Sequence, residues 1–179
     1  MTCIVGVAYR GSVFIGGDSA AVAGDSINIR ADEKVFQNGE FLMGFAGSFR
    51  VGGLMRYAFV PPEYTGDDEM RYLTVDFVDA MRAVQQNKRA MRRMNEETHE
   101  SDASFLVGFR GHLFEVATDY QIARPLESYA AIGSGADVAL GALAATSRMK
   151  DPRKRVLIAL EAAAAHCSGV RAPFSIMKI

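Results

Sequence analysis

The feature that most constrains the fold is a series of four short β-like runs near the N-terminus. The run from Cys3 to Arg10 and the run from Val13 to Gly17 are rich in small and β-forming residues, and a glycine turn joins them. Such a pair predicts a β-hairpin. The runs Val35-Phe36 and Phe41 to Ala46 flank an Asn38-Gly39 turn and predict a second hairpin. The chain therefore begins as antiparallel β-structure.

Blocks of helices and strands follow along the rest of the chain. Apolar residues at helical spacing predict two helices, then a second group of strands, then two more helices and a last strand. The predicted helices cover 48–60, 74–94, 135–147 and 151–168, and the predicted strands cover 104–110, 112–118, 128–132 and 174–179. Two sheets, each covered by a helical layer, would bury every apolar face. We expect a single α+β domain spanning residues 1–179, with Thr74 capping the second helix.

Composition narrows the class of protein. A formal net charge of −1 argues against a dedicated nucleic-acid-binding protein, and no apolar run reaches the roughly 20 residues that span a membrane. There is no secretory signal pattern, and Cys3 and Cys167 form neither a disulfide framework nor a zinc spacing. A cytoplasmic protein is the expectation.

The second predicted helix ends in a basic cluster. One hypothesis is a docking site for an acidic partner or nucleic acid, and the other is a solvated helix end whose cations favour the C-terminal dipole. The acidic tract 96–102 follows directly and would neutralise much of the charge, which favours the second hypothesis. The cluster consists of Lys88, Arg89, Arg92 and Arg93.

Candidate chemistry lies at the start of the chain. If Met1 is removed, as small second residues generally permit, Thr2 carries both a hydroxyl and a free α-amine. An amine with a pKa of about 7.7–8.0 can take the hydroxyl proton as the oxygen attacks a carbonyl. The first predicted hairpin returns Asp18 to the chain start, and Lys34 opens the third run. We therefore expect these three side chains at the ends of adjacent strands.

This spacing of Thr2, Asp18 and Lys34, with the later segments LMGFAGS and AIGSGAD, resembles the proteasome β-subunit family of N-terminal nucleophile (Ntn) hydrolases. The similarity is greatest to the short bacterial HslV-type threonine peptidases. It extends over essentially the whole chain and implies a four-layer αββα sandwich of two mostly antiparallel sheets.

The resemblance also implies a role for each matching residue. Thr2 would be the nucleophile and its own amine the base, with the Lys34 cation lowering the pKa of both groups. Asp18 would orient Lys34, Gly44 would donate its N–H to the developing oxyanion, and Ser134 would help to pass the proton to the leaving group.

A substrate pocket and a cation site are further implications. Asp32 and Arg50 would pair at the pocket rim, and Met43 at its base would favour an apolar substrate side chain. The expected pocket lining is Ala21, Asp32, Phe36, Met43, Ala46 and Arg50. Catalysis would need no cofactor, but backbone oxygens of Ala164, Cys167 and Val170 would hold a structural Na⁺ or K⁺.

The leading hypothesis is a threonine endopeptidase subunit. The resemblance implies a homo-oligomeric ring, stacked as a double ring, that receives polypeptide substrates from an ATP-dependent unfoldase. Two alternatives stay open at this point. One is an Ntn amidohydrolase that acts on a small amide, and the other is a ring or scaffold subunit without peptidase activity.

Overall fold

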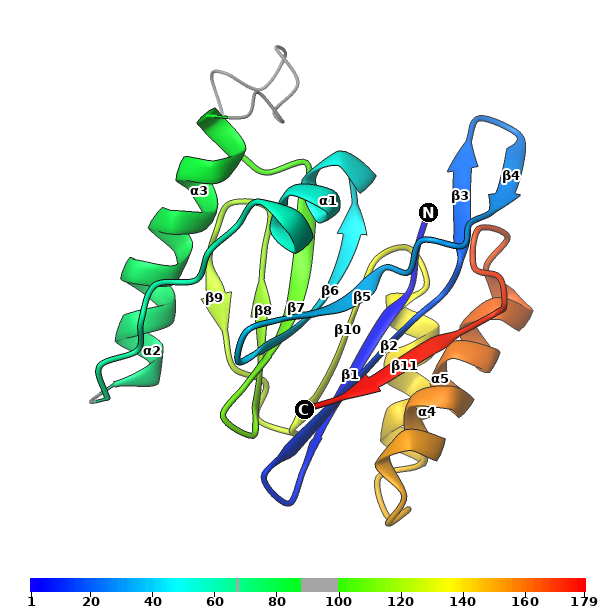
Figure 1. Ribbon diagram of the computed structural model, residues 1–179. Helices are drawn as coiled ribbons and strands as arrows, with labels where there is room; N and C mark the ends of the chain where they lie inside the picture. The colour runs from blue at the N-terminus through cyan, green and yellow to red at the C-terminus, as the bar shows by residue number, and fades with distance from the viewer. Residues whose placement is uncertain (67, 88–99) are drawn as a thin grey trace.

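The computed structural model describes residues 1–66, 68–87 and 100–179. Two sheets face each other, and each carries helices on its outer side (Figure 1). The first sheet has the order β10 (Tyr129–Ile132), β1 (Ile4–Tyr9), β2 (Ser12–Gly17) and β11 (Ser175–Lys178). The second has the order β5 (Val35–Asn38), β6 (Phe41–Gly47), β7 (Ala103–Phe109), β8 (His112–Val116) and β9 (Ile122–Ala123).

The helical layers complete a four-layer αββα sandwich. One layer, against the first sheet, consists of α4 (Ala136–Ala145) and α5 (Pro152–His166). The other covers the second sheet with α1 (Phe49–Tyr57), α2 (Glu69–Tyr72), a π-helical turn η1 (Leu73–Phe77) and α3 (Val78–Asn87). Each strand pairing in the described residues is antiparallel. The α+β sandwich expected from the sequence is therefore confirmed.

Apolar side chains between the sheets fix how the layers stack. Ile4 and Ile15 from the first sheet meet Leu42 and Leu106 from the second, and all four are at most 1% exposed. Two further clusters lie between each sheet and its helices. Strand side chains alternate between the two faces of a sheet, and here one face packs on the other sheet and the opposite face on helices. Both faces of the central strands are therefore buried, which explains their nearly continuous apolar runs.

Two local predictions were wrong. Asp68, rather than Thr74, caps the second helical segment: its carboxylate accepts the N–H of Arg71, so that segment begins at Glu69. The sequence reading also missed the short hairpin of β3 (Ala20–Ala23) and β4 (Ser26–Ile29), which stands apart as a two-stranded sheet. β4 alternates polar and apolar residues, but the run is only four residues long and all four are exposed.

The structure does not test the prediction for the basic cluster, and it tests the absence of a membrane-spanning helix only in the described residues. The basic cluster of 88–93 lies outside the described residues. In the ranges that the structure does describe, no helix is both long enough and apolar enough to cross a membrane.

Candidate active site

The Thr2 hydroxyl lies beside a buried lysine. Thr2 lies two residues before the first residue of β1, and Lys34 directly precedes β5, so the two strands bring residues of different sheets together. The Lys34 Nζ donates a hydrogen bond of 3.1 Å to Thr2 Oγ1. Lys34 is 1% exposed and Thr2 is 6% exposed. A fixed cation therefore faces the only polar atom of the Thr2 side chain.

Asp18 holds that lysine in place. Its Oδ1 accepts from Lys34 Nζ at 2.8 Å and from the Cys3 N–H at 3.0 Å, and its Oδ2 accepts from the Ala20 N–H at 2.9 Å. The pair is fully buried. Burial lowers the pKa of Lys34 from its ordinary value, and the hydrogen bond and charge of Asp18 oppose this decrease. The carboxylate, fixed by two backbone donors, thus positions and partly neutralises the cation.

Ser134 approaches the backbone of Thr2. The Thr2 N–H donates to Ser134 Oγ at 3.1 Å, and the Ser134 hydroxyl lies 3.3 Å from Thr2 O. A Cβ on Gly133, which has φ +93°, would stand 2.4 Å from Thr2 O, so only glycine permits this approach. Gly135 is the N-cap of α4 without a side-chain cap, so the Ser134 hydroxyl is engaged with Thr2 rather than with the helix.

Gly44 does not join this cluster. The bonds from Phe45 N–H to Lys34 O (3.1 Å) and from Ser48 N–H to Asp102 O (2.9 Å) show that odd-numbered N–H groups of β6 point toward β5 and even-numbered ones toward β7. The Gly44 N–H therefore faces Leu106 within the sheet. The expected oxyanion donor does not fit this geometry.

The same alternation identifies a better-placed N–H group. Gly47 is exposed, and its N–H points to the side of Lys34, where β5 has not yet begun. The neighbouring Ala46 Cβ lies 3.3 Å from the position of a Gly133 Cβ, which in turn adjoins Thr2 O. The C-terminal end of β6 therefore lies next to Thr2, and its last N–H has no strand partner on that side.

The residues expected to line the substrate pocket differ in burial: some lie in the core and others are partly or fully exposed. Phe36 and Met43 face each other across β5 and β6 and are buried in the core cluster under α1. Ala46 is 7% exposed, Ala21 is half-buried in β3, and Arg50 is exposed on α1.

The expected ion pair between Asp32 and Arg50 is wrong. Asp32 instead accepts two hydrogen bonds from Arg30, at 2.7 Å and 2.6 Å, and the bond from this guanidinium lowers the pKa of the carboxyl. The Arg30 guanidinium lies 4.2 Å from the centre of the Phe49 ring, and Lys34 Nζ lies 5.8 Å from it. Sequence reasoning missed Arg30 and Phe49, because only the fold places the start of α1 over Lys34.

Arg171 occupies the position expected for a monovalent cation. Its Nη1 donates to Cys167 O at 3.1 Å and to Val170 O at 2.7 Å. Cys167 O also accepts the Val170 N–H at 3.2 Å, so both of its lone pairs are used. Ala164 lies in the last turn of α5. A positive group already satisfies two of the three carbonyls, and these residues do not fit a bound Na⁺ or K⁺.

Thermal unfolding is therefore expected at the same temperature in NaCl, KCl and choline chloride of equal ionic strength. Arg171→Met should lower the free energy of unfolding by about 1–3 kcal/mol, because two carbonyls lose a charged donor. Arg153→Met is the matched control, since Arg153 Nη1 reaches one exposed carbonyl, that of Ile176. Selective stabilisation of the unmodified protein by Na⁺ or K⁺ would contradict this assignment.

Neither cysteine is a candidate nucleophile on geometric grounds. Burial raises the pKa of Cys3 to about 12, with the Asp18 charge adding to the effect, so this thiol stays protonated. The Cys167 Sγ lies 3.9 Å from Ser134 O, to which it donates a weak hydrogen bond.

Met1 determines whether Thr2 has a base. In the full chain the Thr2 nitrogen is an amide, and Thr2 Oγ1 donates to Met1 O at 2.6 Å. The Met1 side chain lies against Gly169, where a Cβ would stand 2.2 Å from Met1 Cβ. Removing Met1 would convert the amide into an amine and free the hydroxyl.

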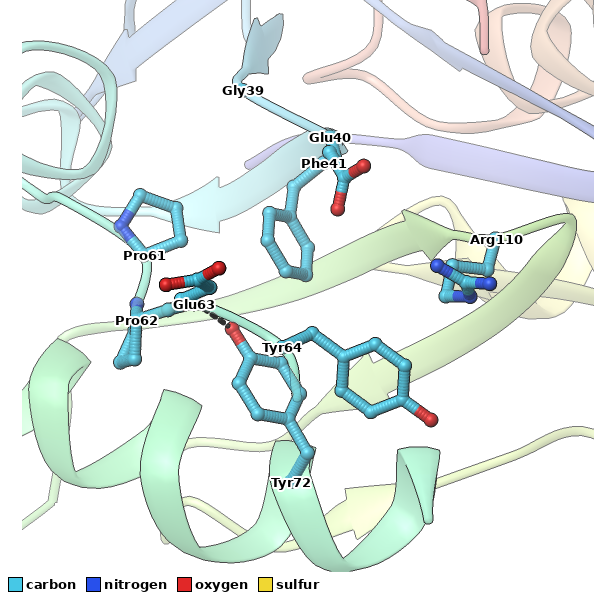
Figure 2. A pocket seen from close by; sticks show the side chains of 9 residues that line it. All are labelled: Gly39, Glu40, Phe41, Pro61, Pro62, Glu63, Tyr64, Tyr72 and Arg110. Atoms are coloured by element: carbon cyan, nitrogen blue, oxygen red, sulfur yellow. Dashed lines mark hydrogen bonds between the residues drawn. The ribbon is translucent and has the colours of Figure 1, made fainter. Parts of the chain in front are cut away.

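A cavity of about 440 Å³ lies elsewhere, under the β5–β6 turn (Figure 2). Phe41, Tyr64 and Tyr72 line it with Pro61 and Pro62, and Tyr72 donates a hydrogen bond to Pro62 O. None of the expected site residues contributes to it. Among the described residues, no group of acidic, histidine and cysteine side chains could hold a metal ion.

Comparison with known proteins supports the fold. No family model matches the sequence. The Thiobacillus denitrificans protein BPH superimposes with a TM-score of 0.85 at 19% identity, over 99% of this chain and 97% of that one. HslV from Trypanosoma brucei gives a TM-score of 0.71 at 20% identity, over 99% and 98% of the two chains.

A third structure, Anbu (ancestral beta-subunit) from Yersinia bercovieri, gives a TM-score of 0.66 at 17% identity, over 99% of this chain and 81% of that one. These identities support a shared architecture rather than a shared activity. The chain therefore has the fold of the HslV-like, proteasome-type Ntn hydrolases.

Proposed function

We propose that this protein is a threonine-type endopeptidase whose nucleophile is Thr2. The observation that carries the proposal is the buried chain of contacts from Asp18 through Lys34 Nζ to Thr2 Oγ1. A buried ion pair is costly to form, and its only hydroxyl partner here belongs to the residue that would become the N-terminus. Core packing alone gives no reason for a lysine at this position.

The mechanism needs a chain that begins at Thr2. The free α-amine accepts the hydroxyl proton while Oγ1 attacks the substrate carbonyl, and the nearby Lys34 cation favours the neutral amine and the developing alkoxide. Ser134 Oγ, 3.1 Å from the nitrogen, can relay the proton to the departing amine. Water activated by the same amine then hydrolyses the ester and restores the hydroxyl.

The oxyanion donor in this proposal is the Gly47 N–H. It points to the side of Lys34 and has no strand partner there, whereas the Gly44 N–H faces Leu106 within the sheet. One such donor is worth about 2.7–4 kcal/mol of transition-state stabilisation.

Assembly and substrates are proposed by analogy with the proteins that share the fold. We expect a homo-oligomeric ring, stacked as a double ring, since HslV-like and proteasome-type neighbours suggest ring-forming oligomers. An ATP-dependent unfoldase partner, polypeptide substrates and a cytoplasmic location belong to the same proposal.

Intact mass after reaction with epoxomicin tests the chemistry. A solved structure of Thiobacillus denitrificans BPH contains this compound. We expect a chain that lacks Met1 to gain the mass of one epoxomicin molecule, and Thr2→Ala to gain none. A chain that retains Met1 and stays unmodified would support a peptidase-inactive subunit instead. Modification of Thr2→Ala would exclude Thr2 as the reacting residue.

A further inference from the structure

Two hairpin turns with the same Arg-Gly sequence meet at the end of the sandwich away from Thr2. Arg10-Gly11 joins β1 to β2, and Arg110-Gly111 joins β7 to β8, so each sheet contributes one turn (Figure 1). A Cβ on Gly111 would stand 2.8 Å from Gly11 O. The two turns are therefore in direct contact, and both arginines project from one junction between the sheets.

Both turns place an arginine in a conformation that arginine rarely adopts. The φ angles are 51° and 75° for Arg10 and Gly11, and 48° and 80° for Arg110 and Gly111, as in type I′ turns. Asn, Asp or Gly occupies the first of these positions at lower conformational cost, because a longer side chain gains no local hydrogen bond there. The backbone conformation alone therefore does not account for an arginine at both positions.

A cavity of about 180 Å³ opens at this junction, and both arginines line it. Arg124 lines it from the loop after β9, together with His112 and Ser128. Three arginines thus line a single small cavity, in a chain whose formal net charge is −1. The positive charge is therefore concentrated locally at this cavity, where it favours binding of an anionic ligand.

The carboxylates nearby do not balance these charges. Glu69 lies 3.8 Å from Arg110 Nε and 2.6 Å from His112 Nδ1. Arg10 stacks on the ring of Tyr9 at 5.2 Å, which leaves its charge uncompensated. Arg124 has no hydrogen bond, ion pair or ring contact within the described ranges. Glu69 contacts Arg110 and His112, whereas Arg10 and Arg124 form no ion pair within the described ranges.

Arg110 is the fixed member of the cluster. Besides its contact with Glu69, it lies 5.2 Å from the centre of the Tyr64 ring and also borders the larger cavity, as Figure 2 shows. Ser128 is also held in place: it has φ 57°, and its carbonyl accepts the Ala8 N–H at 2.8 Å. Its hydroxyl has no partner among the described residues and remains available to a ligand.

We propose that this junction is a binding site for a phosphate group, either free or on a small organic molecule. The planar guanidinium fork matches the spacing of phosphate oxygens, and several guanidinium groups together favour a dianion over a single carboxylate. The cavity volume of about 180 Å³ is sufficient for one phosphate group. The site lies on both sheets, so an occupied site would join the two hairpin ends.

Calorimetric titration at constant ionic strength tests this assignment. We expect inorganic phosphate and ribose 5-phosphate to bind saturably with one site per chain, and sodium chloride to give no saturable heat. Arg124→Gln should weaken binding about tenfold or more, as expected for the loss of one charge-assisted donor. Arg148→Gln, an exposed arginine outside the cavity, is the matched control and should bind like the unmodified protein.

Arg10→Asn separates a binding role from a structural one. Asparagine suits the first position of a type I′ turn, so this variant should unfold at the same or a higher temperature while binding phosphate about tenfold more weakly. A lower unfolding temperature with unchanged binding would assign Arg10 to the fold and overturn the proposal. Binding that does not saturate, or that weakens equally in Arg148→Gln, would also overturn it. Thr2→Ala should bind phosphate normally, which keeps this test independent of the proposed peptidase activity.

Discussion

Thr2→Ala is expected to abolish peptide hydrolysis, with kcat lower by about 10⁴-fold or more. Loss of the nucleophile leaves only binding and oxyanion stabilisation, which together give a small residual rate. The variant should keep its fold, because Thr2 Oγ1 contributes one hydrogen bond to Lys34 and is otherwise engaged only with Met1 O. Turnover of fluorogenic peptides by the chain that begins at residue 2 is the measurement.

Two control variants interpret that result. Thr2→Ser keeps a hydroxyl beside Lys34 and should retain measurable activity. Thr146→Ala removes a hydroxyl that donates to Ala142 O at the end of α4, far from Lys34 in the sequence and in another layer, and should not change kcat. If Thr2→Ala hydrolyses the same peptides at an unchanged rate, the proposed nucleophile is wrong.

Lys34→Met is expected to lower the free energy of unfolding by about 3–5 kcal/mol. The substitution leaves Asp18 fully buried without its cation, and an uncompensated buried charge is strongly destabilising. The backbone donors of Cys3 and Ala20 remain and offset only part of this loss. Chemical denaturation of the variant measures the difference, and peptidase activity should be lost in parallel because Thr2 Oγ1 loses its neighbouring cation.

The chain offers a matched control for that effect. Arg30 and Asp32 form an ion pair of similar length, but their side chains are 42% and 50% exposed. Arg30→Ala should therefore cost at most about 1 kcal/mol. Adding Asp18→Asn to Lys34→Met should recover part of the stability, since it removes the unpaired charge while retaining an acceptor. Equal costs for Lys34→Met and Arg30→Ala would show that burial does not make the Lys34 pair special.

Much of the architecture follows from local patterns. The N-terminal strands and the start of α5 at Asp151-Pro152 could be predicted because each is set by residues adjacent in the chain. The structure contains these strands, and Asp151 accepts the Lys154 N–H as the N-cap of α5. β4 does alternate polar and apolar residues, but it is only four residues long and fully exposed, so it was missed. The start of the second helical segment was missed because the capping Asp68 lies in a polar stretch that reads as linker.

The candidate site divides in the same way. Thr2 and Asp18 could be grouped from the sequence, because hairpin geometry returns the end of β2 to the start of β1. Lys34 precedes a strand of the other sheet, so only its match to the family spacing grouped it with them. The proposed oxyanion donor could not be grouped with them from the sequence. Gly44 and Gly47 are both glycines in one segment, and only the hydrogen-bond alternation of β6 distinguishes an N–H that faces Leu106 from one that points to the side of Lys34.

By itself, then, the sequence determined most of the order of strands and helices and the pairing of Thr2 with Asp18, because these depend on short-range patterns and on the ends of one hairpin. Only the tertiary structure decided which groups reach that cluster from elsewhere. Arg171 replaces the expected cation at Cys167 O and Val170 O, and Phe49 lies over Lys34. Such contacts join segments that are distant in the chain, so their distances depend on how the four layers pack.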